Sequence, residues 1–196
     1  MENKHHIPKG SQVYSPKGVR DKFEQAVTGE GGDIGKVLTN KHKYKELLEL
    51  WHASFLAWAI NKWLNKKYFI YPADNPDSPG SPDTIFLNEQ AGEAFPVEIT
   101  ELHLNADDIW RAKGLHDRKD CHLLIISRKN EPAFNVGEFA RAIQQHDWKF
   151  ERIWLAIYTS SIITWTFFEL FPPAQTGEVP SIKVSTQNQE DMAFWY

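Results

Sequence analysis

The sequence predicts a single α/β domain built on a mixed β-sheet flanked by helices, and three observations lead to this fold class. Residues 42–66 carry a broad apolar face without glycine or proline, which is typical of a long helix packed on more than one neighbour. Two short apolar strands, residues 81–87 and 95–100, enclose a turn-like segment and predict an antiparallel hairpin. The continuous apolar run in residues 122–127 predicts a central strand covered on both faces, as in parallel sheets.

The remaining elements follow from shorter patterns along the chain. Residues 72–82 contain four prolines and therefore predict a loop, whereas the polar residues 101–119 predict a short helix and a loop. Further elements are predicted as a strand at 68–71, a helix at 136–146, strands at 152–158 and 162–168, and an edge strand at 182–185. A hairpin flanked by helices, then a buried strand and a helical crossover, indicates a mixed-sheet sandwich.

The length and composition bound the domain organisation. A chain of 196 residues is long enough for one domain with a substantial core and short for two. Residues 1–40 are rich in glycine, lysine and polar groups, so we predict an N-terminal polar extension with a short helix at 21–27. Residues 41–196 are predicted to form the α/β domain.

The charge and the cysteine content exclude several classes of protein. A net charge of −4 means that any nucleic-acid surface must be local. The single cysteine, Cys121, allows neither an internal disulfide nor a recognisable zinc site. The N-terminus is polar and no apolar run approaches the length of a membrane span, so the sequence predicts a cytoplasmic protein with no membrane partner.

Two carboxylates occupy the predicted hairpin. Asp83 opens the first strand, and Glu98 interrupts the apolar second strand. Centring the turn in the connecting segment places Asp83 opposite Thr100 and Ile85 opposite Glu98, with all four on one face. Converging carboxylates form a hard-oxygen site suited to Mg²⁺ or Mn²⁺. The alternative interpretation is structural: Asp83 is then a turn residue after proline, and Glu98 a solvated strand residue.

These residues resemble the signature of the PD-(D/E)XK nuclease superfamily, whose members share the restriction-endonuclease-like fold. Pro82 and Asp83 match the acidic residue on the family's second strand, and Glu98-Ile99-Thr100 matches the Glu/Asp-X-Lys of the third. Thr100 replaces the motif lysine. The resemblance covers roughly residues 44–158 as an order of elements, and only a few residues as a motif.

The resemblance implies a metal-dependent endonuclease, a hydrolase that cleaves DNA phosphodiester bonds with Mg²⁺ or Mn²⁺. Asp83 and Glu98 would bind the metal, and Glu49, or alternatively Glu46, on the first core helix would assist. DNA is the expected partner. Many nucleases of this fold act as homodimers, although this sequence carries no dimerisation signal.

Thr100 has no positive charge, and three interpretations of the motif stay open. A lysine from elsewhere, such as Lys113 or Lys119, supplies the charge; the site works with two metals or a polar substitute; or the nuclease fold is catalytically inactive and serves for nucleic-acid binding or protein interaction. A separate hypothesis is an unrelated α/β domain that binds protein partners through aromatic residues, including Trp195 and Tyr196 at the tail.

Overall fold

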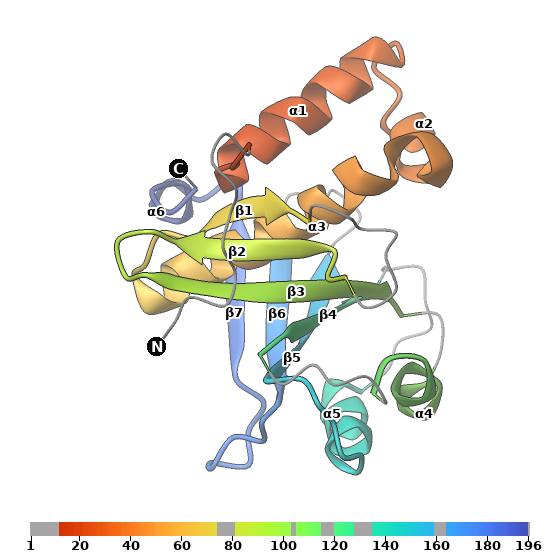
Figure 1. Cartoon of the computed structure of the whole chain (residues 1–196), viewed down its shortest axis with the longest axis vertical. Helices are drawn as coiled ribbons and strands as arrows, with labels where there is room; N and C mark the ends of the chain where they lie inside the picture. Colours follow the sequence, from red (N-terminus) through yellow and green to blue (C-terminus); the bar gives the residue numbers. More distant parts are fainter. Residues whose placement is uncertain are drawn as a thin grey trace.

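A seven-stranded mixed sheet forms the centre of the protein, with its strands in the order of the chain (Figure 1). The structure is a computed structural model that describes residues 12–73, 81–102, 105–114, 120–127, 135–158 and 164–195. The strands are β1 Phe69–Pro72, β2 Thr84–Asn88, β3 Glu93–Glu101, β4 His122–Ser127, β5 Arg152–Tyr158, β6 Thr164–Phe171 and β7 Ser181–Ser185. The β3–β4 and β4–β5 pairs are parallel and the other neighbours antiparallel, which confirms the predicted α/β class with a mixed sheet.

The helices lie on both faces of this sheet. They are α1 Pro16–Gly29, α2 Ile34–Thr39, α3 Lys41–Leu64, α4 Ala106–Ile109, α5 Val136–Gln144 and α6 Gln189–Met192, and a π-helical turn, η1 Trp110–Gly114, directly follows α4. None of the helices in the described part of the chain is long and apolar enough to cross a membrane.

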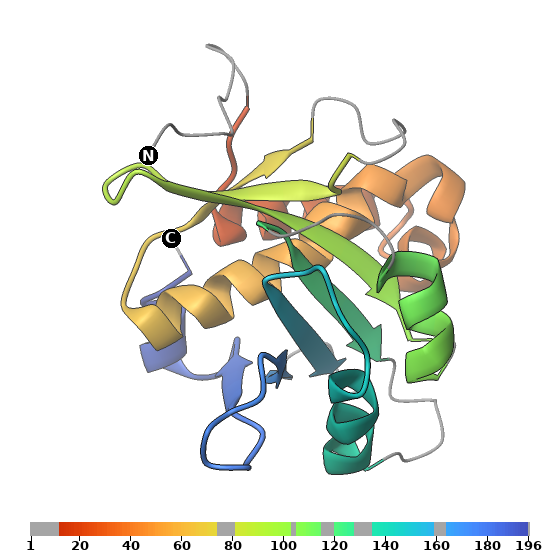
Figure 2. The same ribbon diagram turned by 60° about the horizontal axis from the view of Figure 1, so that its bottom comes forward.

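The middle of helix α3 is buried on all sides, because the sheet curls around it and α1 packs against it. Figure 2 shows α3 running between the β2–β3 hairpin and the strands β6 and β7, and the helix contacts strands from both ends of the sheet. As a result, every residue of α3 from Leu50 to Asn61 is buried. The prediction that this helix packs on more than one neighbour is therefore confirmed.

The N-terminal helices share the core of α3. Phe23 of α1 is buried and stacks on Trp51 of α3 with ring centroids 4.4 Å apart. Helix α1 begins earlier than predicted, because Ser15 caps its N-terminus and Pro16 occupies the first turn. An isolated bridge between Tyr14 and Ile70 joins the segment before α1 to the sheet.

Helices α4 and α5 lie on the opposite face of the sheet from α3 (Figure 1), and a second core of buried residues lies beneath them. Strand β4 serves both cores: Leu124 and Ile126 point toward α3, whereas Leu123 and Ile125 point toward the second core. All six residues of β4 are buried. The predicted doubly covered strand is thus confirmed, and the side on which a β3 residue lies decides which helices it meets.

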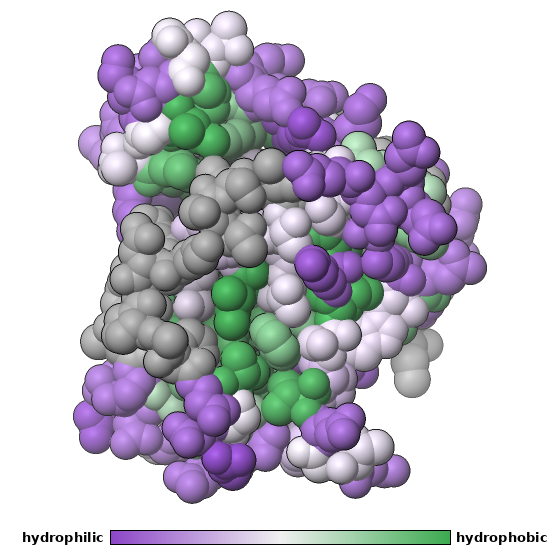
Figure 3. Space-filling view, turned by 180° about the vertical axis from the view of Figure 1, so that it is seen from behind, coloured by the Kyte–Doolittle hydropathy of each residue, from purple (hydrophilic) through white to green (hydrophobic). Residues whose placement is uncertain are grey.

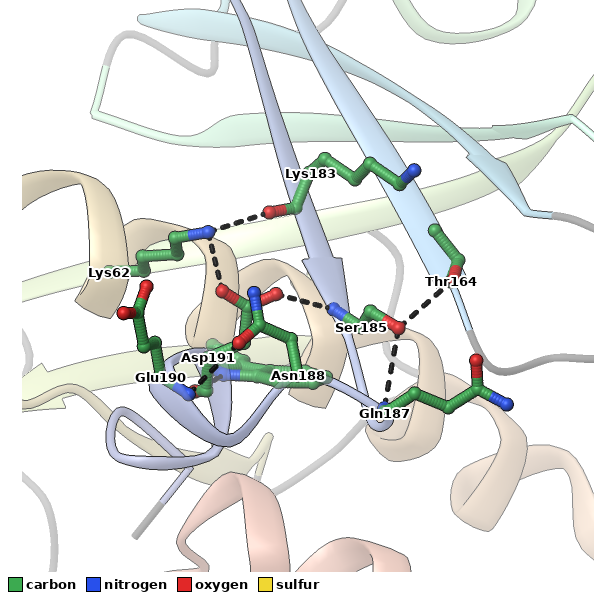
Figure 4. Close-up of polar contacts among 9 residues, drawn as sticks. Lys62, Thr164, Lys183, Ser185, Gln187, Asn188, Glu190 and Asp191 are labelled. Atoms are coloured by element: carbon green, nitrogen blue, oxygen red, sulfur yellow. Dashed lines mark hydrogen bonds and ion pairs between the residues drawn. The ribbon is translucent and has the colours of Figure 1, made fainter.

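The C-terminal segment is held on α3 and β7 by a buried carboxylate (Figure 4). Asp191 accepts from Lys62 Nζ at 2.6 Å and from the Ser185 backbone N–H at 2.8 Å. Trp195 is only 2% exposed and stacks on Trp58 at 4.4 Å. The predicted aromatic interaction surface therefore does not include Trp195, while Tyr196 lies outside the described residues.

Apolar side chains show in several separate places among hydrophilic ones on the face drawn in Figure 3. Within the described part of the chain, the exposed large apolar residues are Ile34, Trp63 and Leu64. Ile34 belongs to α2, whereas Trp63 and Leu64 end α3. These positions are separated in the fold, so they do not together reproduce the expected aromatic docking surface.

The predicted hairpin register is wrong by two residues. Ile85 pairs with Pro96, not with Glu98, and continuing the register from the Thr84–Val97 pair places Asp83 across from Glu98, not Thr100. The turn explains the shift, since it is a short loop that closes between Asn88 and Glu93. A shift of two residues keeps every side chain on its face, whereas a shift of one would have separated the two carboxylates.

Candidate active site beside strand β3

The two predicted carboxylates meet where the antiparallel hairpin joins the parallel part of the sheet. Glu98 lies in β3, which pairs with β2 on one side and with β4 on the other. Val97 and Ile99 pack toward α3, so Glu98 points to the face covered by α4 and η1. Its partner in the parallel register, Leu123, belongs to the core on that same face.

Asp83 is positioned by the backbone of β3. Its N–H donates to the carbonyl oxygen of Val97 at 3.1 Å, which extends the hairpin ladder by one residue beyond β2. Its side-chain Oδ2 accepts from the N–H of Ile99 at 2.6 Å. The carboxylate is therefore held against β3 beside Glu98.

The electrostatic surroundings of Asp83 oppose its negative charge. Burial raises the pKa of the Asp83 carboxyl, and the charge of Glu98 raises it further. The Ile99 hydrogen bond and the positive charges of Lys113 and Lys45 act in the opposite direction, but the net pKa stays above its ordinary value. A like-charge pair of carboxylates thus shares a partly desolvated place.

Lys113 brings a positive charge to Glu98. The Glu98 residue is buried, with 5% exposed, and its Oε1 pairs with the Lys113 Nζ. Lys113 is carried by the π-helical turn η1. Of the two lysines that could replace the missing motif charge, Lys113 is thus the one beside Glu98, while Lys119 lies outside the described residues.

Thr100 and Glu101 lie on opposite faces of β3. Thr100 is half-buried and shares the face of Glu98, as the alternation predicts. Glu101 turns to the other face and pairs with Lys41 of α3 at 2.8 Å. The site therefore has an uncharged hydroxyl at the motif position, and Glu101 is not part of it.

Glu49 lies on α3, the helix that covers the face opposite to Glu98. Lys45, one turn earlier on the same side of that helix, is close enough for its charge to act on Asp83. Glu49 is half-buried, whereas Glu46 is exposed. The first half of α3 thus approaches the Asp83 end of the site, and a role for Glu49 in metal binding stays a prediction.

The donor chemistry of the two carboxylates fits a divalent cation in part. Among the residues that the structure describes, no group of three or more His, Cys, Asp and Glu side chains is arranged to hold a metal ion. Asp83 and Glu98 nevertheless offer the hard oxygen donors that Mg²⁺ prefers. A cation between them would also offset the burial and the Glu98 charge that raise the pKa of Asp83.

Comparison with known proteins gives no match, whether with family models, with curated proteins or with solved structures.

Proposed function

We propose that this protein is a metal-dependent nuclease of the restriction-endonuclease-like class that hydrolyses DNA phosphodiester bonds. The observation that carries the proposal is the grouping of Asp83, Glu98 and the ammonium of Lys113 at one place on β3. Two carboxylates and one lysine are the residue types that the PD-(D/E)XK motif uses, and here the lysine comes from η1. The order of elements from α3 to β5 supports the same class.

Each side chain has a part in the proposed reaction. Asp83 and Glu98 would hold Mg²⁺ or Mn²⁺, and Glu49 stays a predicted accessory carboxylate that the described residues do not group with these two. The bound ion would supply a Lewis acid and lower the pKa of a water molecule. The Ile99 N–H keeps the Asp83 carboxylate oriented. Lys113 orients Glu98 and presents a positive charge that would stabilise the negative charge developing on the phosphate.

A cleavage assay with matched glutamate variants tests the proposal. Supercoiled plasmid and single-stranded DNA are incubated with Mg²⁺ or Mn²⁺ and with wild type, Glu98→Gln or Glu101→Gln. Glu101 lies three residues further along β3 on the opposite face, so its variant controls for the loss of a strand carboxylate. We expect Glu98→Gln to lose cleavage by about 100-fold or more, with Glu101→Gln close to wild type. Equal cleavage by Glu98→Gln and wild type would overturn the site.

The second candidate is a catalytically inactive module of the same fold that binds nucleic acid or a protein partner. The pairing of Lys113 with Glu98 favours it, because this ion pair neutralises the buried carboxylate without a metal. The same assay separates the two. Absence of cleavage by wild type with either ion, together with salt-sensitive DNA binding, would support the binding module.

A further inference from the structure

Lys113 and Arg111 lie on the same π-helical turn but have different surroundings. Helix α4 passes directly into η1 at Trp110, and a π-turn holds more residues than an α-turn, so the side chains that follow are rotated from their α-helical directions. Lys113 pairs with Glu98. Arg111 is 70% exposed and pairs with Asp108 at 3.2 Å. The path of the turn thus decides which cation reaches the carboxylates.

A close contact inside the turn explains why its last residue is glycine. A Cβ added to Gly114 would lie 2.3 Å from Cδ1 and 2.7 Å from Nε1 of the Trp110 indole. Cβ atoms essentially never approach other atoms so closely, so no other residue fits without moving the ring. The φ of Gly114 lies outside the left-handed region. The requirement for glycine is therefore steric, and Trp110 rests directly against the backbone next to Lys113.

The Trp110 indole is in turn held by the segment after α5. The ring of His146 stacks on it, with centroids 5.0 Å apart and an interplanar angle of 13°. His146 Nε2 lies 2.9 Å from Asp107 Oδ1 of α4, and Trp148 meets the His146 ring edge-on. A continuous set of contacts therefore runs from α4 through His146 and Trp110 to Gly114.

We infer that Trp110, Gly114 and His146 are positioning residues that hold η1 in the conformation that directs Lys113 to Glu98. The Trp110 indole packs against the backbone of η1, the stacked His146 ring fixes its position, and Gly114 leaves space for it. None of the three touches the carboxylates in the contacts described above; they act through Lys113. The link to catalysis rests on the proposed nuclease function, whereas the link to the ion pair does not.

The test follows both the ion pair and the activity. The ammonium resonance of Lys113 in isotope-edited NMR is assigned by its loss in Lys113→Met, and Arg111→Met serves as the control cation on the same turn. We expect Gly114→Ala to abolish or shift this resonance. We also expect it to lower kcat by about 100-fold, the cost of a misplacement of about 1 Å. Arg111→Met should leave both unchanged.

A double-mutant cycle tests whether the contact with Trp110 is the cause. A Trp110→Ala background lacks the indole ring that the new Cβ would meet, so adding Gly114→Ala should change the resonance and kcat no further. Equal effects of Gly114→Ala in both backgrounds, or a wild-type resonance in Gly114→Ala, would overturn the inference. If Gly114→Ala does not fold, His146→Ala replaces it, and an unchanged Lys113 resonance in that variant would also overturn the inference.

The two proposals fail separately. Loss of the Lys113 resonance in Gly114→Ala, with no cleavage by wild type under any divalent ion, would uphold the positioning role and reject the nuclease. Cleavage by wild type that is lost in Glu98→Gln but retained in Gly114→Ala would uphold the nuclease and reject the positioning role.

Discussion

Lys113 and Glu98 form an ion pair although 15 positions separate them in the sequence. Glu98 sits in the middle of the sheet, and Lys113 reaches it from a turn of π-helix on the covering layer. A positive charge therefore stands beside the carboxylate even though position 100 is threonine. Asp83 is half-buried beside this pair, and His122 and Asp191 are buried polar groups elsewhere in the fold.

Removing the Lys113 charge should destabilise the protein much more than removing its neighbour on the turn. Lys113→Met leaves the buried Glu98 carboxylate without this cation, at a cost of about 2 kcal/mol. Arg111→Met breaks only an exposed pair and should cost less than about 0.5 kcal/mol. Urea unfolding at neutral pH measures both. Equal losses would mean that the Lys113–Glu98 pair does not form in solution.

Asp83→Asn should make the protein more stable at neutral pH while weakening metal binding. The raised pKa of Asp83 means that the folded state binds a proton more readily than the unfolded state. Its charge thus costs stability in full above the folded-state pKa, and the cost shrinks to zero as the pH falls from that pKa to the ordinary pKa of the unfolded carboxyl. Asparagine removes the charge and keeps an acceptor for Ile99. We expect a gain of roughly 0.5–2 kcal/mol.

Urea unfolding and Mn²⁺ titration calorimetry measure the two effects of Asp83→Asn. The control is Asp147→Asn, because the Asp147 side chain is 83% exposed. If Asp83→Asn binds Mn²⁺ as tightly as wild type, the assignment of Asp83 as a metal ligand is contradicted. If Asp83→Asn loses stability instead of gaining it, the idea that the Asp83 charge destabilises the folded state is contradicted.

His122 should make the protein sensitive to mild acid. It is 5% exposed, stacks on Phe95 at 4.1 Å and accepts from Trp154 Nε1 through Nδ1. Burial, together with the charge of Arg152, lowers its pKa to about 3. The unfolded chain gains this proton below about pH 6.5 and the folded protein does not, so stability falls with pH through this window. The expected loss is about 2 kcal/mol between pH 6.5 and pH 5.

Unfolding free energies at these two pH values, for wild type and His122→Asn, check this expectation. Asparagine keeps an acceptor for Trp154 but loses the ring that stacks on Phe95, so the variant should be less stable at neutral pH. Because asparagine does not titrate, the stability of the variant should fall less in acid. His42→Asn, at an exposed histidine of α3, is the control and should keep the wild-type fall. An unchanged fall in His122→Asn would assign the acid sensitivity to other groups.

Asp191→Ala should release the C-terminal segment. The substitution leaves Lys62 and the Ser185 N–H without their buried acceptor, at a cost of about 3 kcal/mol. The neighbouring Glu190→Ala removes an exposed carboxylate from the same helix and should be nearly neutral. Limited proteolysis and tryptophan fluorescence follow the release, because the stack of Trp195 on Trp58 depends on the same segment. Matching behaviour of the two variants would rule out the role of Asp191.

In the hairpin, the alternation of apolar residues predicts the face of each side chain but not its cross-strand partner. The face shared by Asp83 and Glu98 was predictable, because alternation along each strand needs only the apolar positions. The cross-strand partner of each residue was not predictable, since it depends on where the loop between the two strands closes. Gly92 adopts a left-handed φ of 64°, and the Asn88 side chain accepts from Ala91. These two local features set the end of the turn, and no apolar pattern encodes them.

The sequence by itself determined α3, the strands of the sheet and the carboxylate face, but not α2, α6 or the π-helical turn. The apolar run of α3, the buried β4 and the alternation in β3 each reflect burial, which a single chain records in its own periodicity. The tertiary structure alone decided the register that sets Asp83 across from Glu98, the curl of the sheet around α3, and the choice of Lys113. Those three depend on contacts between residues far apart in the chain, and the place of Lys113 depends on the packing of Trp110 against Gly114.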